Sequence, residues 1–225
     1  MALEVSSAVQ DYAKSIYSLQ HRGDGAPVTT NALAARVGVS AASASTMVKK
    51  LDGLGLVEHV PYKGVVLTEA GARVALEVLR HHRLLERFLA EELGVPWDRV
   101  HDEAEVLEHV LSEELEELIA AKLGHPTIDP HGDPIPTADL RIVEGDTVSM
   151  ETLEPGDTGR FVRISDSDPE MLRYLGDRGI APGAAFEVLD KQPFGGPLFA
   201  RFGGAEQVHP LGGRLAAAMR VEMGA

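Results

Sequence analysis

Apolar residues at helical spacing, separated by short polar or glycine-containing breaks, organise the start of the chain. Between residues 7 and 19 the apolar positions recur every three or four residues, which predicts an amphipathic helix. A threonine-capped helix that ends at Gly38 follows, and Ser40 can cap a third helix within residues 41–55. Two short helices joined by the tight turn Gly-Val-Ser are typical of a helix-turn-helix.

A β-hairpin is predicted directly after the third helix. The runs Leu-Val-Glu-His-Val and Gly-Val-Val-Leu flank a turn at Tyr62, Lys63 and Gly64, in the place of a wing. The exposed half of the third helix is small and polar and becomes basic at Lys49 and Lys50. This pattern suits approach to the major groove of double-stranded DNA, with phosphate contacts from Lys49, Lys50 and Lys63. The alternative is an ordinary helical subdomain with a solvated serine-rich helix.

Two long amphipathic helices are predicted next, at residues 70–93 and 102–123. Their apolar faces exceed what one small domain can cover, so we expect a homodimer whose contact surface comes from residues 74–123. Four prolines between Pro126 and Pro136 then exclude a regular helix or an inner strand and indicate a linker.

The remainder alternates apolar and polar residues and turns at Gly and Pro, as a small antiparallel β-barrel does, with one short helix within residues 169–179. The sequence therefore predicts an α+β protein. Its expected parts are an N-terminal winged helix-turn-helix at 1–73, a helical dimerisation domain at 74–125, a proline-rich linker at 126–147 and a β-barrel at 148–225.

The stretch HDEAEVLEH, residues 101–109, carries the densest candidate chemistry. It places two histidines and four carboxylates in nine residues. On a helix, His101, Glu105, Glu108 and His109 follow one another at steps of four, three and one, so they share a face. A metal site is one interpretation of that face, and a solvated acidic helix surface is the other.

The composition narrows the chemistry. The chain of 225 residues contains no cysteine, which excludes disulfides and thiolate ligands and leaves oxygen and imidazole for a metal. The net charge of -14 is distributed unevenly along the chain, because residues 1–73 hold seven Lys and Arg against six Asp and Glu. No leader peptide is recognisable and no run of about 18 apolar residues occurs. We therefore expect a cytoplasmic protein without membrane association.

These features together resemble the diphtheria toxin repressor family of metal-dependent transcriptional repressors. The winged helix-turn-helix, the run HHRLLERFL, the stretch VHDEAEVLEHVLS, the segment DPHGDPIP and the C-terminal barrel occur in the family's order over nearly the whole chain. The resemblance implies an SH3-like, FeoA-like barrel and a homodimer that binds operator DNA and represses metal-uptake genes when a divalent metal is abundant. It implies no enzymatic activity. The family's base-facing positions fall on Ser40, Ala42, Ser43 and Thr46.

The family's two metal sites can be carried over residue by residue. The resemblance places the primary site on Asp11, Glu105, Glu108 and His109, and the ancillary site on His82, Glu86 and His101. Asp168 or Glu170 would complete the ancillary site from the barrel, unless these acids merely begin a helix. Because Asp11 belongs to the DNA-binding part, a metal in the primary site would tie that part to the dimerisation helices.

The donor types favour manganese. Iron-responsive members of the family place Met and Cys where this chain has Asp11 and Glu105, so both soft positions are hard oxygen here. Mn²⁺ lies at the bottom of the affinity order and depends on carboxylate-rich sites, so the chain resembles the three-domain manganese transport regulators. Fe²⁺, in an iron-dependent regulator of the same family, and Co²⁺ remain alternatives. Two-domain manganese regulators carry a second glutamate where this chain has Lys14, which favours two separated sites over a paired-metal centre.

Two other functions compete with this one. A metal hydrolase would need an open coordination position and a general base such as the Glu of HExxH, and that motif is absent from the sequence. A metal-independent DNA-binding regulator would keep its affinity for DNA after chelation of divalent metals.

Overall fold

The computed structural model describes residues 5–23 and 25–224, which form two compact units. The first unit comprises the chain as far as His82, with Val106–Glu116 and Pro136–Arg141. The second comprises Arg83–Glu105, Glu117–Ile135 and Ile142–Ala225. One boundary between the units falls within a single helix, α4, between His82 and Arg83.

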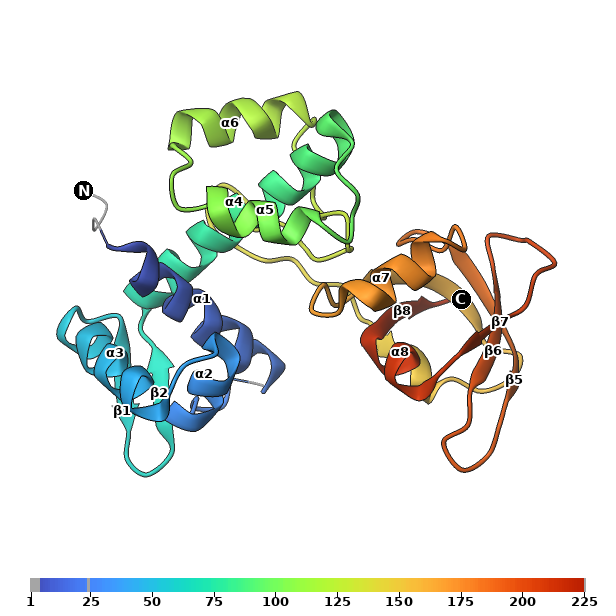
Figure 1. Cartoon of the computed structure of the whole chain (residues 1–225), viewed down its shortest axis with the longest axis horizontal. Coiled ribbons are helices and arrows are strands. Elements are labelled where there is room, and N and C mark those ends of the chain that lie inside the picture. Colours follow the sequence, from blue (N-terminus) through green and yellow to red (C-terminus); the bar gives the residue numbers. More distant parts are fainter. Residues whose placement is uncertain (1–4, 24, 225) are drawn as a thin grey trace. The chain divides into compact units, whose positions relative to one another are not determined.

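Three helices open the first unit (Figure 1). They are α1 (Ser7–Arg22), α2 (Thr30–Val37) and α3 (Ala41–Gly53). The Thr29 hydroxyl accepts the N–H of Ala32 at 3.1 Å and so caps α2, and Ser40 caps α3 through the N–H of Ser43 at 3.1 Å. Gly38 turns the chain between the two helices in the left-handed region, with φ of 73°. The predicted helix-turn-helix is confirmed.

The predicted wing is also present. Strand β1 (Val57–Val60) pairs in antiparallel register with β2 (Gly64–Leu67), and the turn between them carries Tyr62 and Lys63. The wing is fastened to the loop before α2 by two backbone hydrogen bonds between Val28 and Val65, of 2.8 and 3.0 Å. Its base and the three helices share one core. That core includes Ile16, Leu33, Leu51, Leu56 and Val65.

The helical middle of the chain differs from the sequence expectation in one respect. The elements are α4 (Glu69–Leu93), α5 (Val100–Leu107) and α6 (Glu113–Lys122). The second long helix that we expected at residues 102–123 is therefore broken. Ser112 caps the start of α6, because its hydroxyl and its carbonyl accept N–H groups of the first turn at 3.2 and 2.8 Å. Glu108 and His109 consequently lie in the turn after α5 and not on a helical face.

The C-terminal part is a six-stranded antiparallel sheet in the order β3-β8-β4-β5-β6-β7. Its strands are β3 (Val148–Ser149), β4 (Thr158–Ile164), β5 (Ala185–Lys191), β6 (Leu198–Phe202), β7 (His209–Leu211) and β8 (Met219–Met223). The expected helix is α7 (Pro169–Gly176), and a further short helix, α8 (Gly213–Ala218), precedes β8. Phe161, Leu175 and Val188 lie in the core that the strands and α7 enclose. This sheet is the predicted SH3-like domain.

The longest helix, α4, has 25 residues and is amphipathic, with charged residues along its whole length. None of the helices in residues 5–23 and 25–224 combines the length and the apolar character needed to cross a membrane.

Candidate metal centres and DNA-binding surface

The first candidate metal centre joins α1 to the turn after α5. Asp11 of α1 and Glu108 and His109 of that turn direct potential ligand atoms to one region, all within 4.8 Å of one another. His109 Nε2 lies 2.9 Å from Asp11 Oδ1 and 3.6 Å from Glu108 Oε1. The structure thus brings together three of the four residues that the resemblance assigns to the primary site.

Gln10 orients the ring of His109. Its amide oxygen lies 2.7 Å from His109 Nδ1, and an amide oxygen only accepts, so Nδ1 carries the hydrogen in this pair. The lone pair of Nε2 then faces Asp11 and Glu108, which is the arrangement of a metal-ligating histidine. Sequence reasoning missed Gln10, because the two residues are 99 positions apart and only the fold brings them together.

Glu108 is the buried centre of this cluster, with a side chain that is 0% exposed. Its Oε1 accepts a hydrogen bond from Lys14 Nζ at 2.5 Å, and its Oε2 pairs with Nδ1 of His82 on α4. The neighbouring His81 Nδ1 lies 3.0 Å from the backbone carbonyl of Glu108, so α4 packs against this turn. This packing explains why His82, which the resemblance assigns to the ancillary site, meets a residue of the primary site.

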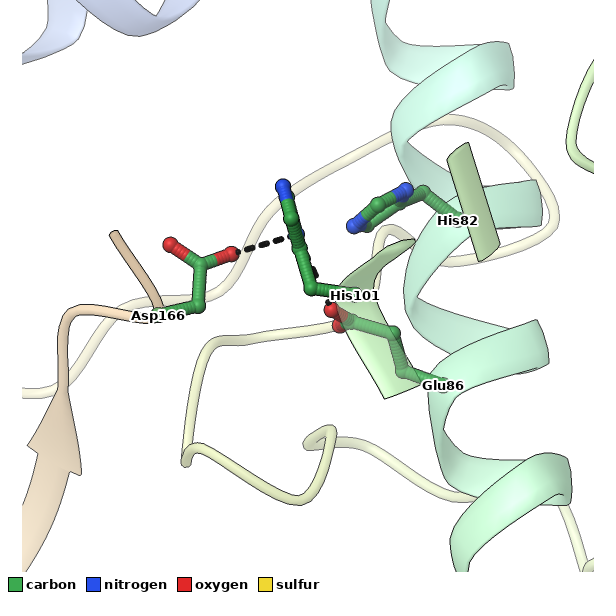
Figure 2. A group of neighbouring side chains, drawn as sticks. All are labelled: His82, Glu86, His101 and Asp166. Carbon is green, nitrogen blue, oxygen red and sulfur yellow. Dashed lines mark ion pairs between the residues drawn. The ribbon is translucent and has the colours of Figure 1, made fainter. Parts of the chain in front are cut away.

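The second candidate centre lies in the other compact unit. Figure 2 shows Glu86 of α4 and Asp166, which follows β4, on either side of His101 of α5, with His82 one turn before Glu86. His101 Nδ1 lies 3.4 Å from Glu86 Oε1 and 3.0 Å from Asp166 Oδ2. Hydrogen bonds to Asp166 and Glu86 raise the pKa of His101 to about 10 against the effect of burial. The carboxylates of this centre therefore stabilise positive charge between them.

The ion pair with His101 also changes the pKa of Asp166. Burial alone would raise the pKa of the Asp166 carboxyl, but the hydrogen bond from His101 and its charge lower that pKa to about 2. Asp166 is thus a carboxylate, a hard anionic donor of the kind that Mn²⁺ and Fe²⁺ accept.

His131 completes the second centre from the proline-rich segment. Its side chain is 0% exposed, and its Nε2 donates to the backbone carbonyl of Trp97 at 2.7 Å. Its Nδ1 has no hydrogen-bond partner among the described residues and lies 3.8 Å from Glu86 Oε1. A buried imidazole nitrogen aimed at a carboxylate, with its other nitrogen held by a carbonyl, fits a metal ligand.

The charged groups around His131 are also consistent with a bound cation. Burial, followed by the charges of Asp133 and Glu86, raises the pKa of Asp129 well above its usual range. Burial lowers the pKa of His131, yet the interaction with the nearby Glu86 carboxylate, the charge of Asp129 and the hydrogen bond to the Trp97 carbonyl raise that pKa to about 9. Glu86, Asp129 and His131 offer ligand atoms within 4.8 Å of one another, so this buried group favours a bound cation.

The sequence-derived ligands of the barrel lie elsewhere. Asp168 Oδ1 accepts the N–H of Glu170 at 3.1 Å and caps α7, and its Oδ2 accepts from Arg214 at 3.2 Å. Neither Asp168 nor Glu170 belongs to a group of potential ligands within the described part of the chain. Asp168 begins a helix, which is the alternative that the sequence left open, and Asp166, two residues earlier, reaches His101.

Sequence reasoning missed three residues of the second candidate centre, namely Asp129, His131 and Asp166. Glu105, which the resemblance assigns to the primary site, lies beside His101 of the second candidate centre. The segment that contains Asp129 and His131 was interpreted as a linker, although the spacing Asp-Pro-His in a proline-rich segment was a usable signal. The sequence alone could not show which acidic residue of this stretch lies near His101, because that depends on where β4 ends. Glu105 Oε1 lies 3.9 Å from His101 Nε2, one helical turn away on α5.

The predicted DNA-binding residues share one property, which is exposure to solvent. They are Ser40, Ala42, Ser43 and Thr46, with Lys49, Lys50 and Lys63. The opposite face of α3 is buried through Ala44, Val48 and Leu51, so the small polar face is left for contact with a partner. The hydroxyls of Ser40 and Ser43 lie 2.9 Å apart and can exchange this mutual bond for bonds to bases.

Comparisons with known proteins agree with this architecture over nearly the whole chain. Residues 4–65 match the N-terminal DNA binding domain of the iron dependent repressors, and residues 68–137 match their metal binding and dimerisation domain. Residues 148–223 match the FeoA domain. The iron-dependent repressor IdeR of Mycobacterium tuberculosis is 30% identical over 213 residues, which cover 86% of this chain and 88% of that protein. The diphtheria toxin repressor of Corynebacterium diphtheriae is 30% identical over 191 residues, 80% of this chain and 83% of that one.

Solved structures of manganese-dependent proteins are also similar. A manganese-dependent transcriptional repressor in complex with manganese is 44% identical, with a TM-score of 0.86 over 96% of this chain and 99% of that one. The manganese regulator SloR is 28% identical, with a TM-score of 0.76 over 96% and 98% of the two chains. The chain therefore belongs to the diphtheria toxin repressor family, as a metal-dependent transcriptional repressor that binds operator DNA as a homodimer and is not an enzyme.

Proposed function

We propose that this chain is a Mn²⁺-activated repressor, which binds operator DNA when Mn²⁺ occupies its metal centres and thereby represses metal-uptake genes. The observation that carries the proposal is the first cluster, in which Asp11 of the DNA-binding helices lies 2.9 Å from His109 of the dimerisation segment. A divalent cation supplies the charge and coordination that hold such ligands together, so its binding would couple metal concentration to the position of α1.

We assign the ligands to two centres. The first comprises Asp11, Glu105, Glu108 and His109, with His82 beside Glu108. The second comprises Glu86, His101, Asp129, His131 and Asp166. The first connects the DNA-binding helices to the dimerisation segment, and the second connects α4 and α5 to the end of β4. The functional domains would then be the predicted ones, at 1–73, 74–125 and 148–225, with residues 126–147 supplying ligands as well as a connection.

The donor set supports manganese. All nine acidic and imidazole ligands are oxygen or nitrogen donors, and the chain has no cysteine to offer thiolate. Carboxylate-rich sites suit Mn²⁺, which cannot compete by intrinsic affinity, and a similar structure is of a repressor in complex with manganese. Fe²⁺ is the alternative, because iron-dependent repressors are also relatives. Co²⁺ accepts the same donors.

The DNA contacts follow from the exposed face of α3 and from the wing. Ser40, Ala42, Ser43 and Thr46 would face bases, whereas Lys49, Lys50 and Lys63 would face phosphates. The homodimer would use the exposed apolar side chains of the α5–α6 segment, among them Val106 and Val110, which are 72% and 78% exposed. A protein that acts on operator DNA in this way works in the cytoplasm.

Operator binding titrated against metal tests the proposal. The full-length protein is mixed with operator DNA under anaerobic conditions, with EDTA alone or with buffered Mn²⁺, Fe²⁺, Co²⁺ or Zn²⁺, and binding is followed by mobility shift. Tight binding with Mn²⁺ and none with EDTA is expected. Equal binding in EDTA would indicate a metal-independent regulator. Activation by Fe²⁺ at free concentrations well below those required for Mn²⁺ would favour the iron-dependent alternative.

A further inference from the structure

The positively charged ammonium group of Lys14 lies in the first candidate metal centre. Its Nζ lies 2.5 Å from Glu108 Oε1, and the two side chains are 14% and 0% exposed. Lys14 follows Asp11 by three residues on α1, so both side chains leave the same face of that helix. One helix therefore carries both a candidate metal ligand and an ammonium group that is bound to another ligand.

Glu108 has no spare oxygen for an additional cation. Lys14 pairs with Oε1 and His82 pairs with Oε2. His109 Nε2 is 3.6 Å from the same Oε1, and Asp11 Oδ1 is 2.9 Å from that nitrogen. A metal that joins Asp11, His109 and Glu108 therefore needs the oxygen that the ammonium holds. Two cations on one buried oxygen would lie only a few ångströms apart and repel each other strongly, since water does not screen them there.

We propose that Lys14 is a built-in competitor for the metal, whose ammonium must leave Glu108 before a divalent cation can bind there. The inference rests on the proposed metal site at Asp11, Glu108 and His109. The competition raises the metal concentration at which the site fills, because part of the binding free energy replaces the lost ion pair. It also keeps the buried carboxylate neutralised when metal is scarce, since an unpartnered buried charge is strongly destabilising.

The opposite role for Lys14 makes a different prediction. An ammonium that stayed in place beside the metal would offset the repulsion between the carboxylates of Asp11 and Glu108, and it would strengthen binding. Removal of the charge would then weaken metal affinity, whereas removal of a competitor strengthens it. The sign of the change in affinity decides between the two roles.

The test compares Lys14→Met with the wild type in the full-length protein. Mn²⁺ affinity is measured by isothermal titration calorimetry without DNA, and the variant should bind the first Mn²⁺ roughly tenfold more tightly. Lys122→Met is the matched control, because it removes the same charge from an exposed ion pair in which Lys122 Nζ lies 3.1 Å from Glu92. It should leave the dissociation constant unchanged. Lys14→Arg keeps the charge and should remain within about threefold of the wild type.

Thermal unfolding provides a second readout. In EDTA, Lys14→Met should unfold at a lower temperature than the wild type, because buried Glu108 loses its cationic partner. The rise in melting temperature on adding Mn²⁺ should be larger in the variant. If Lys14→Met does not fold, Lys14→Gln removes the charge and keeps a hydrogen-bond donor, with the same tighter binding expected.

Two results would overturn these ideas separately. Wild-type Mn²⁺ binding together with equal or weaker binding by both Lys14→Met and Lys14→Gln would exclude the competitor role. Absence of Mn²⁺ binding by the wild type would instead contradict the metal site itself.

Discussion

At the scale of single residues, Glu108 is both the buried carboxylate that pairs with Lys14 and a proposed ligand of the metal. Glu108→Gln keeps the volume of the buried side chain and removes its charge, so Mn²⁺ loses a central ligand. We expect the half-maximal Mn²⁺ concentration for operator binding to rise by more than about a hundredfold. Glu116→Gln is the control, because Glu116 is also partly buried and paired, with Oε1 at 2.5 Å from Arg80, yet lies outside both centres. It should lower stability and leave the metal threshold unchanged, and a wild-type threshold in Glu108→Gln would contradict the site.

Asp166 and Asp168 offer a second comparison at this scale. Asp166→Asn removes the carboxylate that faces His101. Asp168→Asn alters the cap of α7 and the ion pair with Arg214 but no residue of either candidate centre. Trp97 is the single tryptophan of the chain, and its ring stacks on that of His131 with 5.9 Å between the ring centroids. Mn²⁺ bound in the second centre should therefore quench the fluorescence of Trp97. Asp166→Asn should shift the midpoint of quenching upward by at least about tenfold, whereas Asp168→Asn should keep it. A shift in Asp168→Asn alone would restore the ligand that the sequence suggested.

The residues that sequence reasoning found and missed differ in a physical way. Glu108 and His109 lie in a local cluster with recognisable spacing, so a motif identifies them. Asp129 and His131 belong to a segment without regular structure, where no periodicity predicts which side chains are buried. The hydrogen bond of His131 to the Trp97 carbonyl joins residues 34 positions apart, and no local pattern encodes it.

At the scale of elements, the loop that carries His131 depends on one glycine. Gly132 has φ of 89°, and a Cβ there would lie 1.8 Å from the Val162 carbonyl oxygen of β4. Gly132→Ala must therefore displace the loop from the strand, and we expect a melting temperature lower by about 5 °C or more and a weaker second centre. Gly124→Ala is the matched control, since Gly124 has φ of 73° with nothing within 4 Å. It should lose stability through backbone strain only and retain Mn²⁺-dependent quenching of Trp97; equal effects of the two variants would refute the role of the close contact.

The elements themselves were largely predictable, and the exception has a local cause. The caps at Thr29 and Ser40 and the turn at Gly38 are short-range signals, and the structure has them as predicted. The break between α5 and α6 was missed because the apolar and acidic pattern continues through it. Ser112 was the available signal, as a capping residue followed by the acidic first turn of α6.

At the scale of the whole molecule, charge and function are divided along the chain. The N-terminal 73 residues hold nearly balanced charge while the whole chain carries -14, so we expect DNA contact to depend on a few exposed lysines and not on a broad basic surface. Such a protein gains operator affinity by presenting two recognition helices at once. The family's dimerisation domain covers residues 68–137, so dimer formation and metal binding share one region.

Dimer formation through the turn after α5 can be tested with two matched valines. Val110 and Val143 are both 78% exposed, but Val110 lies in the dimerisation segment and Val143 in the connection to the barrel. Val110→Asp would bury a charge in the dimer contact, so light scattering at micromolar concentration should show monomers and operator affinity should fall at least about tenfold with Mn²⁺ present. Val143→Asp adds the same charge and should leave both measurements at wild-type values. A dimeric Val110→Asp with full operator affinity would place the contact on another part of residues 74–123.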